Sequence, residues 1–294
     1  MGFLQIIGAA LCWSLSAPYV KWIGLPIPYL TSIRCLVPTL VMGGIIYSNL
    51  GIRRIFTPAS YGGVWSWHTT MASLFNLVRS ILYFWGFSVL PVGHAILLIY
   101  TWPIIISLLN WILFKERLTL FQWAMAITAL VGIILIEVQP MAMPTERVIL
   151  GSIGVIIAAM CNAGMILTLQ RTPQPISKTE QVFIQNCFGG LVFLPVFLRD
   201  VVNVSPVRTG ISIIMAVIVG VVGFALFFSA LRKIPTGQAA ILSYIEIVFT
   251  LIIATLFLNE HYTPIQWFGG FLIVLGSVGA QVIQRPIPRQ HPRD

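Results

Sequence analysis

Charged residues are scarce in this sequence. They make up 9% of its 294 residues, whereas a typical soluble domain has about 25%. Hydrophobic residues make up 58%. A water-soluble fold of this length has too little interior to bury so much apolar surface, so the composition predicts an integral membrane protein rather than a soluble enzyme or binding domain.

Clusters of catalytic or metal-binding residues are also missing. The four histidines are scattered along the chain, and the four cysteines do not have the spacing of a metal site. We therefore predict no catalytic residues, no metal site and no cofactor, which makes a membrane-embedded enzyme the less favoured alternative. Repeated rings of polar residues, as a channel would need, are absent from the sequence as well.

Long uncharged runs dominate what is present. There are 23 uncharged residues between Arg147 and Arg171, and 35 between Arg79 and Lys115. A helix needs about 20 residues to cross the hydrocarbon core of a bilayer. The runs predict ten membrane-spanning helices at 3–22, 29–48, 65–88, 93–114, 118–137, 148–170, 181–198, 210–231, 235–258 and 264–284.

The distribution of basic residues predicts the orientation. If the N-terminus is cytoplasmic, eleven Lys and Arg residues fall on the cytoplasmic side and four outside, which is the positive-inside bias. We expect a multi-pass protein of the cell inner (cytoplasmic) membrane with both termini in the cytoplasm, and residues 285–294 as a short basic cytoplasmic tail. The net charge of +9 is therefore assigned to the lipid bilayer rather than to nucleic acid. The oligomeric state stays open.

The sequence repeats itself at a shift of 144 residues. The matched pairs include Pro91 with Pro235, Tyr100 with Tyr244, and Trp123 with Trp267. A first half, residues 1–138, and a second half, residues 148–284, each contain five predicted spans. Because five is odd, the two copies cross the membrane in opposite senses. The predicted fold class is an all-α integral membrane protein with ten transmembrane helices arranged as two inverted five-helix repeats.

Short motifs within the repeat predict local structure. Thr119-x-x-Gln122 and Thr263-x-x-Gln266 each fit a helix capping box. Gly276-x-x-x-Ala280 and Gly220-x-x-Gly223 offer small surfaces that let helices approach closely.

Two strings carry a family resemblance: LPVGHAILLIYTWPIIISLLNWILFKERLTLFQW and IPTGQAAILSYIEIVFTLIIATLFLNEHYTPIQW. Together with SIRC and NLVRSILYF, they resemble the paired repeats of the EamA family in the drug/metabolite transporter superfamily. The resemblance implies a ten-helix, inverted-repeat carrier of small metabolites with a central cavity lined by both halves. Pro103 follows Trp102, but Ile247 follows Glu246, so no proline marks a break in the ninth span.

Three charged residues fall inside predicted spans: Arg34, Arg79 and Glu246. Intramembrane ionisable residues are candidates for function because their burial is costly. Glu246 lies near the middle of the ninth span, and its counterpart under the 144-residue shift is Trp102. The alternative is structural, either an ion pair between Glu246 and one arginine or arginines whose charged ends reach the membrane surface.

Aromatic residues accompany this carboxylate. An aromatic surface facing an acid suits an organic solute with an apolar part and an amine. We therefore predict a secondary transporter that works by alternating access, with amino acids or their derivatives as the first substrate class and proton coupling as an extension. S-adenosylmethionine, nucleosides and cationic drugs stay open as alternatives. The predicted substrate-binding residues are Glu246, Tyr244, Trp102, Tyr100, Arg79, Arg34 and Trp13.

Overall fold

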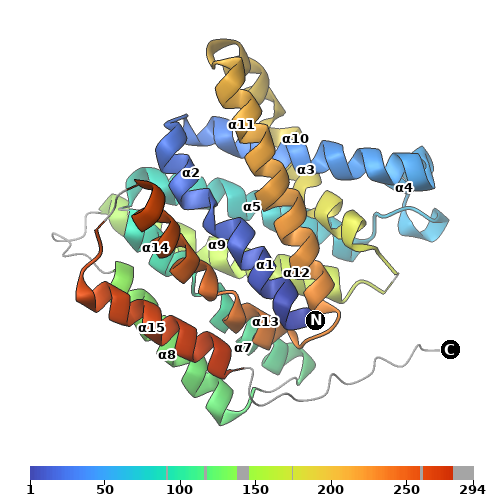
Figure 1. Cartoon of the computed structure of the whole chain (residues 1–294). Helices are drawn as coiled ribbons and strands as arrows, with labels where there is room; N and C mark the ends of the chain where they lie inside the picture. The colour runs from blue at the N-terminus through green and yellow to red at the C-terminus, as the bar shows by residue number, and fades with distance from the viewer. Residues whose placement is uncertain (91, 116–117, 138–145, 174, 259–260, 281–294) are drawn as a thin grey trace.

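The computed structural model describes residues 1–90, 92–115, 118–137, 146–173, 175–258 and 261–280 (Figure 1). Helices make up most of these residues, and the extended pairing among them is a single isolated bridge between Pro58 and Trp65. The predicted tail and the last residues of the tenth predicted span lie outside the described residues.

The helical elements follow one another along the chain with short connections. The first are α1 (Gly2–Ser14), α2 (Ser16–Ile23), α3 (Ile27–Leu50), α4 (Ile52–Phe56), η1 (Ala59–Tyr61), α5 (Trp67–Val89), α6 (Val92–Ile99), α7 (Trp102–Phe114) and α8 (Leu120–Glu137). They are followed by α9 (Glu146–Gln170), α10 (Lys178–Asp200), η2 (Val201–Asn203), α11 (Pro206–Ala216), η3 (Val217–Gly223), α12 (Phe224–Leu231), α13 (Thr236–Leu242), α14 (Ile245–Leu258) and α15 (Pro264–Gly279).

Long apolar helices account for the membrane prediction. In the described part of the chain, seven helical stretches are long and apolar enough to cross a membrane. They are Gly2–Ile23, Ile27–Leu50, Ala95–Phe114, Glu146–Gln170, Lys178–Asn203, Pro206–Leu231 and Thr236–Leu258. The apolar stretches Leu120–Ile136 and Pro264–Gly279 are shorter, and α5 covers most of the predicted span 65–88. The prediction of an all-helical, multi-pass membrane protein is confirmed at this level.

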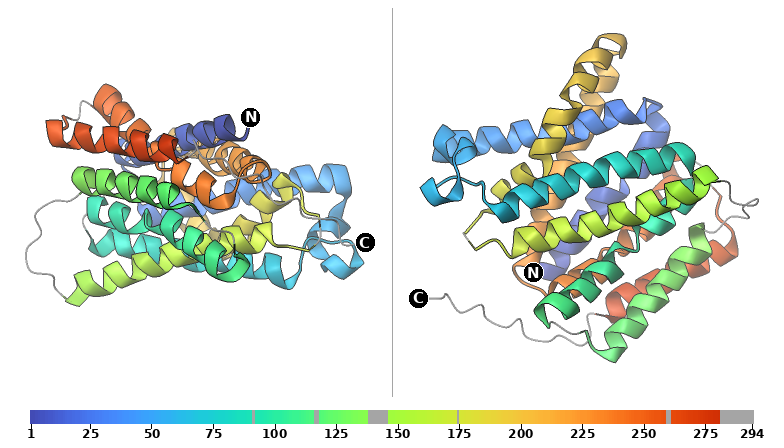
Figure 2. Two further views of the ribbon diagram at one scale, coloured as in Figure 1. Left: turned by 90° about the horizontal axis from the view of Figure 1, so that it is seen from below. Right: turned by 180° about the vertical axis from the view of Figure 1, so that it is seen from behind.

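Helices from the two halves of the sequence pack against each other throughout. The closest partners are α3 with α10, α5 with α9, and α8 with α15. In Figure 1, α8 and α15 lie side by side along one edge of the molecule, and Figure 2 shows the same pairing from two further directions. The helix α1 packs against α12, and α7 packs against α13.

Glycines bring α8 and α15 into direct backbone contact. A Cβ added at Gly269 would lie 2.6 Å from the carbonyl oxygen of Gly132, and one added at Gly276 would lie 2.6 Å from the main-chain nitrogen of Ala129. Both distances are shorter than real Cβ contacts. The predicted close approach at Gly276 is therefore confirmed.

Both predicted capping boxes are present at the starts of these two helices. The main-chain nitrogen of Thr119 donates to Gln122 Oε1 at 2.9 Å, and that of Thr263 donates to Gln266 Oε1 at 2.9 Å. The glutamine amide groups also reach across the helix pair. Gln122 Nε2 donates to the carbonyl of Ala280, and Gln266 Nε2 donates to that of Ile136.

We expect Gly276→Ala to destabilise the protein by about 1–3 kcal/mol, because the added methyl group meets backbone atoms that cannot move aside. Gly44→Ala is the matched control, since a Cβ at Gly44 meets nothing within 4 Å. Thermal unfolding of the purified variants in detergent measures the effect. Equal midpoints for the two variants would contradict the close packing of α8 and α15.

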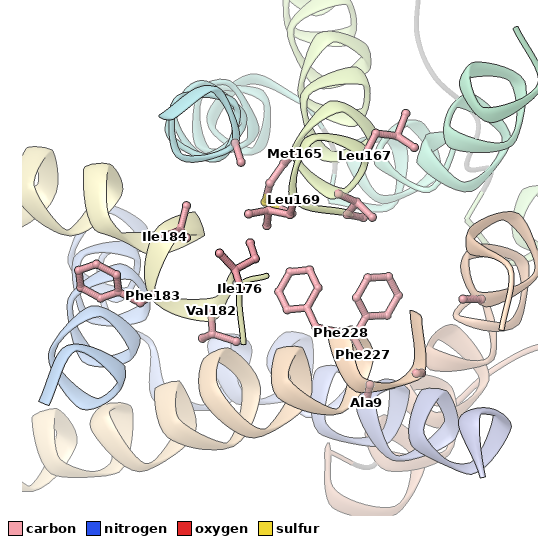
Figure 3. Packing of buried hydrophobic residues seen from close by; sticks show 14 of the residues in the cluster. Ala9, Met165, Leu167, Leu169, Ile176, Val182, Phe183, Ile184, Phe227 and Phe228 are labelled. Atoms are coloured by element: carbon pink, nitrogen blue, oxygen red, sulfur yellow. The ribbon is translucent and has the colours of Figure 1, made fainter. Parts of the chain in front are cut away.

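The largest hydrophobic cluster joins α1, α7, α9, α10, α12 and α13. Phe227 and Phe228 project into it from α12, and their ring centroids lie 5.9 Å apart (Figure 3). Each is only 1% exposed. Since this cluster includes Trp102, the core extends directly to the predicted site.

Candidate functional site

Two helices are interrupted at equivalent places in the two halves. The helix α6 ends at Ile99 and α7 begins at Trp102, whereas α13 ends at Leu242 and α14 begins at Ile245. When 144 is added to the residue numbers of the first break, they match those of the second break to within one residue. The ring centroids of Tyr100 and Tyr244, which lie in the breaks, are 6.3 Å apart, so the interruptions meet inside the molecule.

The second break corrects the expectation drawn from the missing proline. Here the main-chain nitrogen of Glu246 donates to the carbonyl of Ser243 at 3.1 Å, and that of Ile247 donates to Tyr244 at 3.0 Å. Such three-residue spacing tightens the chain relative to an α-helix. The Ser243 hydroxyl donates to the carbonyl of Ala240 at 2.6 Å. Main-chain turns and a serine hydroxyl therefore make the break without a proline.

Glu246 lies in the first turn of α14, directly after this break. Its carboxylate forms a hydrogen bond with the hydroxyl of Tyr100 from the opposite half, and the charge of Arg34 acts on it. The free N–H groups at a helix N-terminus carry partial positive charge, which favours a carboxylate at this position. The structure thus brings Glu246, Tyr100 and Tyr244 together, and Arg34 lies within electrostatic reach of the carboxylate.

Arg79, on α5, is held in place by Asn76 of the same helix. It is 8% exposed, and its Nε and Nη2 atoms donate to Asn76 Oδ1 at 3.1 and 2.7 Å. Asn76 Nδ2 in turn donates to the main-chain oxygen of Gln185 on α10. The two arginines lie close enough for their charges to repel, and Tyr83 lies within the electrostatic reach of both and of Glu246.

Four residues are linked by these electrostatic interactions: Arg34, Arg79, Tyr83 and Glu246. Within the described ranges, neither arginine forms an ion pair with Glu246 at salt-bridge distance. Two positive charges and one negative charge therefore share a partly buried site. Asn76 and Tyr83 were missed by sequence reasoning, although both lie on the same helix as Arg79.

Aromatic side chains border the site from α12. The ring centroid of Trp13 lies 5.0 Å from that of Phe224 and 5.3 Å from that of Phe227. The Trp102 ring lies 6.3 Å from Phe227. The two predicted tryptophans, one on α1 and one on α7, therefore meet the same phenylalanine. The sequence did carry a signal for this wall, since Phe224, Phe227 and Phe228 follow the spacing of one helix face.

A π-helical segment, η3, positions this wall. A Cβ added at Gly223 would lie 2.7 Å from Trp13 Nε1, and one added at Gly220 would lie 2.6 Å from the Pro38 side chain. Both glycines thus permit the close contacts that the sequence predicts. Pro38 lies inside α3 and lacks an N–H group, so it cannot donate to the carbonyl of Arg34 four residues earlier.

Several buried polar atoms around the site have no hydrogen-bond partner among the residues that the structure describes. They are Trp13 Nε1, the Tyr244 hydroxyl, and both Oε1 and Nε2 of Gln185. Such atoms are uncommon in folded proteins, because an unpaired buried polar group is costly. Water or a bound solute would satisfy them. Gln185 was missed from the sequence, where a glutamine inside a span gives no sign of its neighbours.

Metal coordination is not indicated by the geometry. In the described residues no group of three or more His, Cys, Asp or Glu side chains is placed to hold an ion. The polar groups that do converge are instead a carboxylate, two guanidinium groups, phenols and amides. These groups are suited to binding an organic solute by hydrogen bonds and charge.

The sequence matches a known family over most of its length. The pattern of the EamA-like transporter family matches residues 1–138 and 149–280. The chain belongs to the EamA-like transporter family. The two matched ranges nearly coincide with the two halves recognised from the 144-residue shift, and the family is the one that the paired strings resemble.

Named relatives of this EamA-like protein are transporters. It is 24% identical over 210 residues to the uncharacterized transporter sll1319 of Synechocystis sp.. The aligned region covers 70% of this chain and 64% of that protein. The chain thus spans just under two thirds of that relative's length. It is 22% identical over 308 residues to mouse solute carrier family 35 member G1. That aligned region covers 97% of this chain and 79% of the relative.

A solved crystal structure shares the fold. It superimposes with a TM-score of 0.76 at 17% identity, covering 97% of this chain and 99% of the other. The EamA-like protein therefore has a fold already seen in a crystal.

Proposed function

We propose that this transporter is a secondary carrier that moves a small organic solute across the cytoplasmic membrane by alternating access. One observation carries the proposal: the equivalent helix breaks of the two halves meet at Tyr100 and Tyr244, and Glu246 binds the Tyr100 hydroxyl across them. Interrupted helices of inverted-repeat carriers place their ends at the solute site, near the bilayer midplane.

The pattern of helix packing supports two inverted five-helix repeats with ten crossings. In the 144-residue repeat, α3 corresponds to α10 and α8 corresponds to α15. Each of these helices packs against its own counterpart from the other half. The same correspondence maps the pair α5 with α9 onto the pair α12 with α1, which also pack together. An approximate two-fold relation of this kind allows one half to rock against the other.

We expect both termini in the cytoplasm, on the basis of the charge bias. Single cysteines at Tyr61 and Val202, which are 82% and 80% exposed, test the orientation in a cysteine-free background. An impermeant thiol reagent added to intact cells should label Val202→Cys and leave Tyr61→Cys unlabelled until the cells are opened. The opposite labelling would reverse the proposed topology.

The substrate we propose has an apolar part and an amine, with amino acids or their derivatives as the first class. Glu246 offers a counter-charge for the amine, and the wall of Trp13, Trp102 and Phe227 suits the apolar part. The unpartnered Trp13 Nε1 and Tyr244 hydroxyl would gain a partner when solute binds. S-adenosylmethionine, nucleosides and cationic drugs are the other candidates, and proton coupling through Glu246 is part of the proposal.

Flux into liposomes tests the carrier function. Purified protein is reconstituted into liposomes, and separate batches of liposomes are loaded with labelled amino acids, S-adenosylmethionine, nucleosides or a cationic drug. We expect an amino acid or derivative to exchange across the membrane and to be recovered unaltered. Chemical conversion of the solute, or no flux above that of protein-free liposomes for any of them, would contradict the proposal.

A further inference from the structure

Each helix break divides one span into two short helices that correspond between the halves. In the 144-residue repeat, α6 corresponds to α13 and α7 corresponds to α14. The pair α7 with α13 packs closely (Figure 1). Its counterpart, α14 with α6, is not among the closely packed pairs of the described chain. A strict two-fold arrangement would make these two pairs equal, so the molecule is closed more tightly at one end than at the other.

Burial shows the same difference between the two ends. All seven residues of α13 are buried, whereas residues 96–99 of α6 are only partly buried. Four of the fourteen residues of α14 are buried, namely Ile245, Ile247, Leu251 and Ala254. The end at which α7 meets α13, which is the cytoplasmic end in the proposed orientation, is therefore the closed one.

Three helices converge at this closed end: α7, α9 and α13. The Thr236 hydroxyl on α13 donates to Gln170 Oε1 on α9 at 2.6 Å. A Cβ added at Gly237 would lie 3.2 Å from Ser107 Oγ on α7, so this glycine lets α13 approach α7 closely. The region around these four residues is called the three-helix junction below.

Asn110 lies inside the three-helix junction. It follows Ser107 by three residues and precedes Phe114 by four, so these three residues share one face of α7. On this face, Ser107 meets α13. The Phe114 ring meets the end of α9, where Arg171 Cζ lies 3.9 Å from the ring centroid. Asn110 is 3% exposed, so its side chain is enclosed between the contacts that join the helices.

The side-chain amide of Asn110 is unpaired. Neither Oδ1 nor Nδ2 has a hydrogen-bond partner within the described part of the chain. Asn186 on α10 is also buried, but its amide donates to the carbonyl of Val182 at 2.9 Å. An unpaired buried amide destabilises the state that buries it. Water that enters when the helices separate would supply the missing partners.

We propose that the three-helix junction is a gate of the carrier and that Asn110 destabilises the closed form of this gate. The amide loses its water when the gate closes and regains it when the gate opens, so the residue shifts the balance of the two states toward opening. Asn110 acts through the gate and makes no contact with the solute. This inference rests on the proposed carrier function and names a residue that sets how readily the carrier opens.

Replacing the amide by an apolar group of similar size tests this role. Asn110→Leu removes the unpaired polar atoms and keeps the volume, so it should stabilise the closed state. We expect the unfolding temperature of the purified full-length protein in detergent to rise by about 2–6 °C.

A cysteine at Ser107 reports the opening of the gate directly. Ser107 is 2% exposed, so in a cysteine-free background Ser107→Cys should react with a water-soluble thiol reagent only while the junction is open. Adding Asn110→Leu should lower the rate of this reaction about tenfold, because the open state becomes rarer.

Two variants accompany Asn110→Leu. Asn186→Leu is the matched control, since it removes an amide that already has a partner. It should not raise the unfolding temperature and should leave the labelling rate unchanged. Asn110→Ser keeps the test available if the leucine variant does not fold. A serine hydroxyl can donate to the carbonyl four residues earlier, as Ser107 donates to Pro103 at 2.7 Å, so both measurements should shift in the same direction by smaller amounts.

Two results would overturn the proposal. One is a wild-type unfolding temperature and labelling rate in both Asn110→Leu and Asn110→Ser. The other is reaction of Ser107→Cys as fast as that of Tyr61→Cys, which is 82% exposed before substitution, because the junction would then not be closed. Neither measurement uses a solute, so both judge the gate separately from the carrier function, which liposome flux judges.

Discussion

Glu246→Gln is expected to fold and insert like the wild type and to lose most of its transport. The substitution keeps the shape of the side chain and removes the negative charge that we assign to the ammonium group of the solute. A hydrogen bond to a charged group contributes about 1.5–3 kcal/mol, which corresponds to a loss of about tenfold to a hundredfold in apparent affinity. Liposome flux at matched protein content measures the effect.

The Tyr100 hydroxyl provides a companion to this substitution. Tyr100→Phe keeps the ring that faces Tyr244 and removes the hydrogen bond to Glu246, so we expect a smaller loss of transport than in Glu246→Gln.

The dependence of flux on an imposed pH gradient should also vanish in Glu246→Gln if the carboxylate carries the coupled proton. Wild-type flux and pH response in Glu246→Gln would show that the carboxylate has a structural role only.

Arg79→Ala is expected to abolish most transport, and Arg79→Lys is expected to recover only part of it. The alanine variant loses the solute contact and leaves Asn76 Oδ1 without its donor. Lysine restores the charge, but its single ammonium group cannot make two parallel bonds to a carboxylate. Flux assays over a range of solute concentrations separate weaker solute binding from slower turnover.

Arg199→Ala is the matched control for the loss of a positive charge. Arg199 pairs with its neighbour Asp200 at the exposed end of α10, where exposed ion pairs contribute little to stability. It should transport like the wild type. Equal activity of Arg79→Ala and Arg199→Ala, at equal expression, would remove Arg79 from the site.

The elements with a local signal could be predicted from the sequence. Helix positions followed from the lengths of uncharged runs, because the bilayer fixes the length of a spanning helix. The capping boxes at Thr119 and Thr263 followed from residues three positions apart, and the close approach at Gly276 from small side chains. The cost of burying charge marks Arg34, Arg79 and Glu246 as candidates for the site, and their roles stay a prediction.

Features that depend on contacts between distant segments could not be predicted in the same way. The break before Glu246 forms without a proline, through main-chain turns at Ser243 and Tyr244. The unpaired amide of Gln185 becomes visible only when α5 is placed against α10. The motif Gly220-x-x-Gly223 predicts a close approach, but its partners Trp13 and Pro38 come from distant segments and are known only from the structure.

The proline in α3 also affects how Arg34 can be studied. Because Pro38 has no N–H group, Arg34 contributes a carbonyl oxygen that this proline cannot satisfy, as well as a guanidinium group. Substitution of Arg34 by an uncharged residue removes the cation and leaves the oxygen in place. An alanine scan would therefore detect half of what this residue presents, and Pro38→Ala, which restores the missing main-chain donor, would be needed to detect the other half.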